Sequence, residues 1–428
     1  MVFGRRGDVK VRAMIRPAAL AFVTIAACGG AAAHPVLPPH ADPAADRASD
    51  LDWLLTTLEQ RYVYLPEDFN HAALYAQYVG PARAATTRDA WIGVLEDVVG
   101  ELYDHHVSLG TNTAASPRLV PSGADLWGEV TPDGFAKLTA VRRGAAADRA
   151  GLRAGMIVTR LGGVPADEAI ARRRPSVLGG ADREAASWAF RVLLAGTHDG
   201  VRTLTACTSA RACADYTLDA PELPDAPGPV TARLDGDLGY LRLENSLGDD
   251  GTVAAFDAAL AGLAAARGLV LDLRNTPSGG STDVAEPILG RFIDAPAPYQ
   301  QVFVPGHDAK PWLKTLAPRA PYEPRPLVVL VDHWTGSMGE GMAVGLDGLH
   351  RATVVGTAMA GLRGGIGSFE LPRTGIPVRF PIERLAHVDG TPRERWLPPI
   401  LVDVAGGEPV DPILARGEAE LTRLLAGR

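Results

Sequence analysis

One serine of this sequence lies where its hydroxyl group could act as a nucleophile. Ser337 follows the apolar run 326–331, which is typical of a buried strand, and precedes a helix that we expect to begin near residue 339. A hydroxyl at a sharp strand-to-helix turn lies beside free backbone N–H groups and the positive end of a helix dipole, which favour developing negative charge. The same position also suits a simple helix N-cap, so the local pattern allows both roles.

Five segments resemble, in order and spacing, the motifs of one enzyme family. They carry the sequences GYLRL, LDLRNTPSGG, TGSMGE, RATVVG and PPI, at residues 239–243, 271–280, 335–340, 351–356 and 398–400. The set resembles the tail-specific (C-terminal processing) and tricorn-type serine peptidases, over about residues 50–428. The resemblance implies an α/β fold with a crotonase-like layered catalytic domain, and it makes Ser337 the nucleophile.

The resemblance also suggests which groups hold the oxyanion of the reaction. In this family the Gly-Gly segment supplies a backbone N–H, so this role falls on Gly279 or Gly280. One extra residue, Ser278, precedes the pair, and the choice between the two glycines stays open. The N–H of Met338, directly after the nucleophile, is the expected second donor.

A serine nucleophile needs a base, and the family uses two kinds. The tail-specific branch uses a Lys that follows the serine, but Leu362 occupies that position here and no Lys follows Lys314. Arg363, the next residue, stays protonated and cannot replace it. The tricorn-type branch uses a His from the helical region, and residues 104–109 resemble that segment with His106 in the His position. His105 is the competing choice.

Two carboxylates are candidates for supporting roles. Glu394 falls near the family's late Glu, which implies that it orients the base, although a surface ion pair with Arg393 or Arg395 is an equal alternative. Glu340, three residues after Ser337, caps the helix or lines the site.

The surrounding elements group into three regions, as the 428-residue length permits. Residues 229–428 repeat strand–helix–strand order, which predicts the α/β serine peptidase domain. Residues 119–222 alternate short strands and turns, and residues 150–163 resemble a PDZ signature with Met156 in place of the usual Asp. A PDZ-like domain would bind peptides, C-termini included, with 125–128 as the carboxylate-binding loop; a β spacer is the alternative. Residues 49–118 show helical spacing of apolar residues.

The N-terminal sequence indicates export. Residues 1–27 are basic and then apolar over a run too short to span a bilayer, which is typical of a signal peptide. The residues before Cys28 resemble a bacterial lipobox, so Cys28 is expected to carry lipid, with a plain signal peptide as the alternative. Gly29 then favours the outer membrane, and residues 28–48 form a tether. We therefore expect a lipoprotein of the periplasm or cell envelope.

In that oxidising compartment the two remaining cysteines can pair. Cys207 and Cys213 flank a five-residue turn between two predicted strands, which favours a disulfide across a hairpin. Two unpaired thiols or a metal pair are the alternatives, but no nearby Cys or His completes a zinc site.

Charge and motifs limit the remaining classes of function. The net charge of −8 argues against nucleic acid as a partner, and we find neither a metal-binding motif nor a nucleotide fingerprint. The sequence therefore predicts an exported, lipid-anchored serine endopeptidase that acts on proteins or peptides without a metal or other cofactor. A catalytically inactive peptide-binding scaffold, and an esterase with the same oxyanion hole, are the alternatives.

Overall fold

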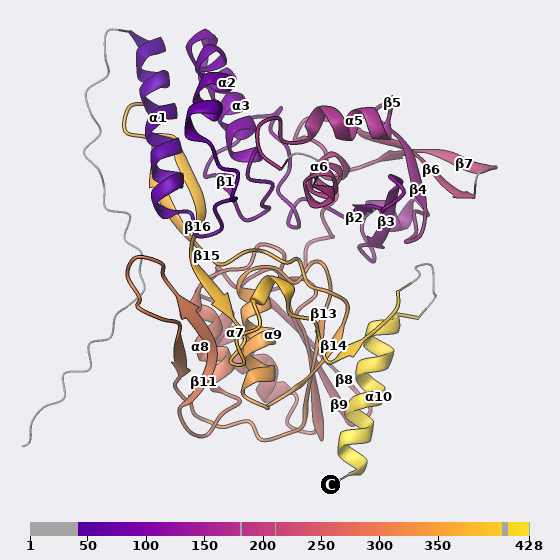
Figure 1. Cartoon of the computed structure of the whole chain (residues 1–428). Helices are drawn as coiled ribbons and strands as arrows, with labels where there is room; N and C mark the ends of the chain where they lie inside the picture. The colour runs from indigo at the N-terminus through magenta and orange to yellow at the C-terminus, as the bar shows by residue number, and fades with distance from the viewer. Residues whose placement is uncertain (1–41, 180–181, 210, 405–409, 428) are drawn as a thin grey trace, which may run out of the picture.

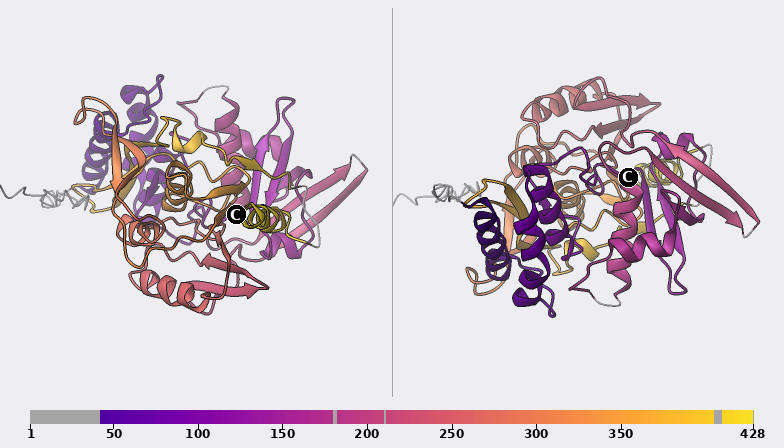
Figure 2. Two further views of the ribbon diagram at one scale, coloured as in Figure 1. Left: turned by 90° about the horizontal axis from the view of Figure 1, so that it is seen from below. Right: turned by 90° about the horizontal axis from the view of Figure 1, so that it is seen from above.

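The computed structural model describes residues 42–179, 182–209, 211–404 and 410–427. The predicted signal peptide, Cys28 and all but the end of the tether lie outside the described residues. Three sheets, each with its own apolar core, meet in one assembly (Figures 1 and 2). Within the described ranges, no helix is long and apolar enough to cross a membrane.

The α/β domain is built on a six-stranded sheet with helices on both faces. The strand order is β17-β14-β13-β10-β9-β8, parallel throughout except for the antiparallel pair β8–β9. The strands are β8 (Val230–Asp235), β9 (Leu238–Leu243), β10 (Gly268–Asp272), β13 (Leu327–Val331), β14 (Thr353–Gly356) and β17 (Ile400–Leu401). The helices are α7 (Thr252–Gly262), α8 (Thr282–Gly290), α9 (Met338–Gly348) and α10 (Pro412–Ala426), with a short 3₁₀ turn at Arg393–Arg395.

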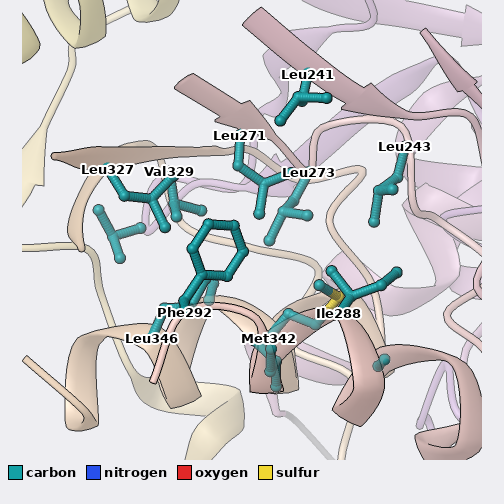
Figure 3. Packing of buried hydrophobic residues seen from close by; sticks show 14 of the residues in the cluster. Leu241, Leu243, Leu271, Leu273, Ile288, Phe292, Leu327, Val329, Met342 and Leu346 are labelled. Carbon is teal, nitrogen blue, oxygen red and sulfur yellow. The ribbon is translucent and has the colours of Figure 1, made fainter. Parts of the chain in front are cut away.

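Successive side chains of the central strands point to opposite faces of this sheet, and both faces are covered by helices. Leu271 and Val329 point toward α7, α8 and α9, where they pack with residues such as Ile288 and Met342 (Figure 3). Val270 and Val328 point the other way, into a smaller core that α10 closes. Strands buried on both faces read as continuous apolar runs, so the expected layered α/β architecture is confirmed.

A second sheet ties the helical region to the α/β domain. It has the order β1-β16-β11-β12, with β15 paired to β16. Its strands are β1 (Ser108–Leu109), β11 (Ala297–Phe303), β12 (Trp312–Leu316), β15 (Gly365–Glu370) and β16 (Pro377–Ala386), and the helices beside it are α1 (Pro43–Arg61), α2 (His71–Ala84) and α3 (Arg88–Gly100). The β15–β16 hairpin runs up against these helices (Figure 1). Its Leu371 and Phe380 are fully buried in the same core as Leu51 and Leu54.

The third sheet belongs to the β domain, in the order β2-β3-β4-β6-β7 with β5 paired to β4. Its strands are β2 (Leu126–Val130), β3 (Ala136–Val141), β4 (Ile157–Leu161), β5 (Val164–Pro165), β6 (Arg202–Ser209) and β7 (Ala212–Leu218). Three helices, α4 (Ala146–Arg149), α5 (Ala166–Arg173) and α6 (Arg183–Ala195), accompany it, and the last two were not expected from the sequence. A disulfide joins Cys207 to Cys213 across the β6–β7 hairpin, with Cα atoms 3.9 Å apart.

The segment expected to be a carboxylate-binding loop is instead the start of strand β2. Asp125 is fully buried, and its carboxylate pairs with Arg202 and accepts a hydrogen bond from the backbone N–H of Ala147. Leu126 and Trp127 are buried as well. These residues hold the β domain together, so their own N–H and side-chain groups do not form an open cradle for a peptide carboxylate.

Candidate active site

Ser337 lies at the strained turn between strand β13 and helix α9. Its backbone has φ of +49° and ψ of −109°, a conformation that side chains other than glycine rarely adopt. Such strain persists only where the surrounding structure enforces it, and it is concentrated at functional sites. Here the backbone N–H of Ser337 donates to Glu340 at 2.7 Å, which holds the turn at the start of the helix.

Glu340 joins the serine turn to a second loop. Its carboxylate is fully buried and also accepts hydrogen bonds from the N–H groups of Gly361, at 2.9 Å, and Leu362, at 3.2 Å. Burial raises the pKa of Glu340 to about 7, although these backbone donors and the nearby Arg393 oppose that rise. Glu340 therefore caps the helix, as predicted, and also connects the serine turn to residues 361 and 362.

The structure distinguishes the two glycines opposite Ser337. The N–H of Gly279 is already bonded to the carbonyl of Thr276, at 3.0 Å. Among the described residues, no hydrogen bond engages the N–H of Gly280 or that of Met338. Gly279 instead provides space, because a Cβ atom there would lie 2.4 Å from the Cβ of Ser337. Gly280 is thus the better candidate donor, a choice that the sequence left open.

His106 precedes strand β1 and is fixed by the same loop that Glu340 holds. Its Nδ1 lies 2.5 Å from the carbonyl oxygen of Arg363, which can only accept, so Nδ1 carries the proton and Nε2 is the ring nitrogen that can accept one. Its backbone N–H donates to Asp104. Burial, and secondarily the charge of Arg393, lowers the pKa of His106 to about 4, so the ring is neutral at neutral pH.

Residues 361–364, which we call the bridging loop, therefore contact His106 directly and are linked to Ser337 through Glu340. Arg393, also buried, donates to the carbonyls of Leu362, at 3.0 Å, and Gly364, at 2.7 Å. Glu340 takes two N–H groups of the same loop and His106 takes its Arg363 carbonyl. No hydrogen bond between Ser337 and His106 themselves exists among the described residues, so the loop is their shared support.

Two other sequence candidates are placed differently. His105 is partly buried, and its Nε2 accepts a hydrogen bond from Arg191 at 2.9 Å. Burial and Arg191 hold its pKa well below the usual range. A ring nitrogen already occupied in this way is a poor base for Ser337. Glu394 is not bonded to His106: its carboxylate accepts from the hydroxyl of Tyr64, at 3.4 Å, while the Arg363 carbonyl occupies Nδ1.

Sequence reasoning missed Arg393 and the Arg363 carbonyl. The charge of Arg393 was visible, but its interpretation as an ion-pair partner of Glu394 overlooked its burial. A backbone carbonyl leaves no residue-type signal, so this contact could not be read from the sequence.

Leu362, at the family's lysine position, belongs to an apolar cluster. It is buried with Val120, Ala124, Trp127 and Ala195, from strand β2, helix α6 and the segment before β2, and with Ala360, which directly precedes the bridging loop. A charged amine would be strongly penalised in this environment. The site is therefore built around an apolar side chain at that position.

A comparison with models of protein families finds one family that matches the part of the chain containing Ser337. Residues 237–400 match the model of peptidase family S41. The matched residues lie in the α/β domain and make up less than half of the chain. Ser337 and both glycines lie inside the matched residues, whereas His106 lies outside them. The match supports a serine peptidase, and the expected resemblance is confirmed.

Solved structures share the fold of the α/β domain and its neighbours. Mature CPAF is 16% identical with a TM-score of 0.58, over 89% of this chain and 96% of that one. The photosystem II D1 C-terminal processing protease is 18% identical with a TM-score of 0.54, over 83% and 93%. A putative peptidase from Parabacteroides merdae is 16% identical with a TM-score of 0.51, over 89% and 96%. No curated protein sequence matches the chain significantly.

Gly279→Ala should abolish turnover. The new methyl group would overlap Ser337, and the φ of +63° would strain any side chain. We expect activity to fall by at least about a hundredfold, because displacing a reacting atom by about 1 Å has that effect. Gly262→Ala, where a Cβ meets nothing within 4 Å, is the matched control and should leave the rate unchanged. Equal rates for both variants would contradict the packing described here.

Proposed function

We propose that this protein is an exported, lipid-anchored serine endopeptidase in which Ser337 is the nucleophile and His106 the base. The observation that carries the proposal is the bridging loop, which supports both groups through Glu340 and the Arg363 carbonyl. The substrates are peptide bonds of proteins or peptides, and no metal or other cofactor takes part.

The proposed reaction is acyl transfer followed by hydrolysis. The Oγ atom of Ser337 attacks the peptide carbonyl carbon while its proton passes to Nε2 of His106. The N–H groups of Gly280 and Met338 stabilise the oxyanion, and the start of helix α9 adds a favourable dipole. His106 then protonates the leaving amine. Water, deprotonated by the same ring, releases the acyl group from Ser337.

In this mechanism the Arg363 carbonyl replaces the carboxylate that we expected from Glu394. It accepts the Nδ1 proton and so keeps Nε2 available, which is the orienting function of the third group in a triad. A carbonyl has no full charge to stabilise the imidazolium that forms. The protonated ring is therefore less stabilised than it would be beside a carboxylate. This agrees with the low pKa of His106, which burial lowers to about 4.

Ser337→Ala and His106→Ala should each remove nearly all turnover, and the double variant should be little worse than either single one. Residues that act as one unit show this non-additivity. We would measure cleavage of a panel of peptides, with free and amidated C-termini, and of small esters. A fluorophosphonate probe should label Ser337 in the wild type and label it poorly in His106→Ala.

The outcomes of this panel separate the alternatives. Near-normal peptidase rates in His106→Ala would contradict the assignment of the base. Turnover of esters alone would favour the esterase. Absence of turnover and of labelling in the wild type would favour a peptide-binding scaffold. Equal rates on free and amidated peptides would remove C-terminal recognition from the proposal.

The acid limb of kcat/KM should have its midpoint near pH 4. Only neutral His106 can accept the serine proton, and burial lowers its pKa to about 4 from a reference of 6.5. Activity is therefore retained as the pH falls through 6.5 and is lost near 4. Glu340→Gln is the control, because a limb near pH 7 that disappears in this variant belongs to Glu340. A midpoint near 6.5 in both proteins would contradict the burial of His106.

The export and anchoring part of the proposal rests on residues 1–28, where the lipobox-like pattern precedes Cys28. Mass spectrometry of the membrane fraction should find a lipid-modified Cys28 at the mature N-terminus. In Cys28→Ala the protein should leave the membrane fraction. An unmodified N-terminus beyond Cys28 in the wild type would remove the anchor from the proposal.

A further inference from the structure

A row of neighbouring rings connects the β domain to the site. Trp188 of helix α6 stacks on His105, with ring centroids 6.0 Å apart, and His105 lies 6.2 Å from Trp127 of strand β2. On its other side Trp127 stacks almost parallel on His333, at 4.7 Å and an interplanar angle of 7°. Arg191 lies 5.0 Å above the Trp127 ring and donates to His105.

Trp127 contacts all three segments from which the site is built. His105 directly precedes His106, the proposed base. His333 lies four residues before Ser337, in the turn between β13 and α9. Leu362 of the bridging loop belongs to the same apolar cluster as Trp127 and directly precedes Arg363, whose carbonyl fixes His106. The Trp127 ring thus lies beside the segment of Ser337, the segment of His106 and the bridging loop that connects them.

Trp127 is tightly packed and rigid, so it can set the distances between the segments that carry His106, Ser337 and the bridging loop. Its side chain is 4% exposed, so it is packed on all sides. Trp is rigid and large, with only two side-chain torsions, and a close-packed interior transmits small displacements to its neighbours. Both histidines beside it are partly buried and have lowered pKa values, so they act here as neutral rings.

We propose that Trp127 is a positioning residue for the peptidase reaction, wedged between His105, His333 and Leu362 so that it sets the separation of His106 and Ser337. The inference rests on the proposed function and adds a residue from outside the S41 match. It implies that the β domain is part of the catalytic geometry whether or not it also binds substrate.

Three variants of the full-length protein test this role. Trp127→Leu removes the ring and keeps an apolar side chain, whereas Trp127→Phe keeps a ring that can still stack. Phe190→Leu is the matched control, because Phe190 is fully buried in the β-domain core and lies outside the ring stack. The readouts are kcat and KM on a cleaved peptide, the rate of fluorophosphonate labelling, and the melting temperature.

We expect Trp127→Leu to lower kcat and the labelling rate by about tenfold to a hundredfold, as displacement of reacting groups does, with KM little changed. Trp127→Phe should recover most of the lost rate. Phe190→Leu should lower the melting temperature at least as much and leave kcat near the wild-type value. Equal kcat in all three variants, or a loss that follows the melting temperature, would overturn the proposal.

Hydrogen exchange provides a readout that does not need activity. Trp127→Leu should speed exchange of the backbone N–H groups of residues 105–107, 333–338 and 361–364, and Phe190→Leu should not. If the wild type is inactive but this pattern appears, the proposed function fails, and with it the catalytic part of this inference, while the structural coupling of Trp127 to the three segments stands. If the wild type is active and exchange in the three segments is unchanged, the positioning role alone is wrong.

Discussion

The proposed chemistry depends on hydrogen bonds that three side chains make to the backbone of the bridging loop. Glu340 accepts from Gly361 and Leu362, Arg393 donates to Leu362 and Gly364, and His106 donates to Arg363. Backbone groups buried away from water must be paired, and here the pairing is used to fix functional side chains. Because the loop is held on both its N–H and its C=O sides, a shift of Glu340 or Arg393 would carry His106 with it.

This arrangement gives a physical reason for a base other than lysine. Leu362 occupies the lysine position of the tail-specific branch and shares an apolar cluster with Trp127. An amine among these apolar side chains would lose its solvation. A neutral imidazole from the helical region costs less to bury, and one carbonyl is enough to select its tautomer.

Much of the framework could be predicted from the sequence, because it depends on residue type and period. The buried strands β10 and β13 read as apolar runs, and the turn after β13 marked Ser337. The rest depends on partners distant in the chain. The choice of Gly280 follows from a backbone bond of Gly279, and the orientation of His106 follows from a backbone carbonyl. Helix α6, with its strong amphipathic pattern, could have been recognised, but the strand signals around it dominated our interpretation.

The β15–β16 hairpin makes the helical region dependent on the far end of the chain. Phe380 completes the core around Leu51, and Asp50 accepts hydrogen bonds from Arg373 and Thr374, the latter 324 residues away. Helices α1 to α3 therefore cannot bury their apolar face until nearly the whole chain has been synthesised. Loop closure over such a separation slows folding and leaves apolar surface exposed meanwhile. In the export proposed above, a chain that crosses a membrane unfolded would benefit, because the helical region cannot become compact before the end of the chain is available.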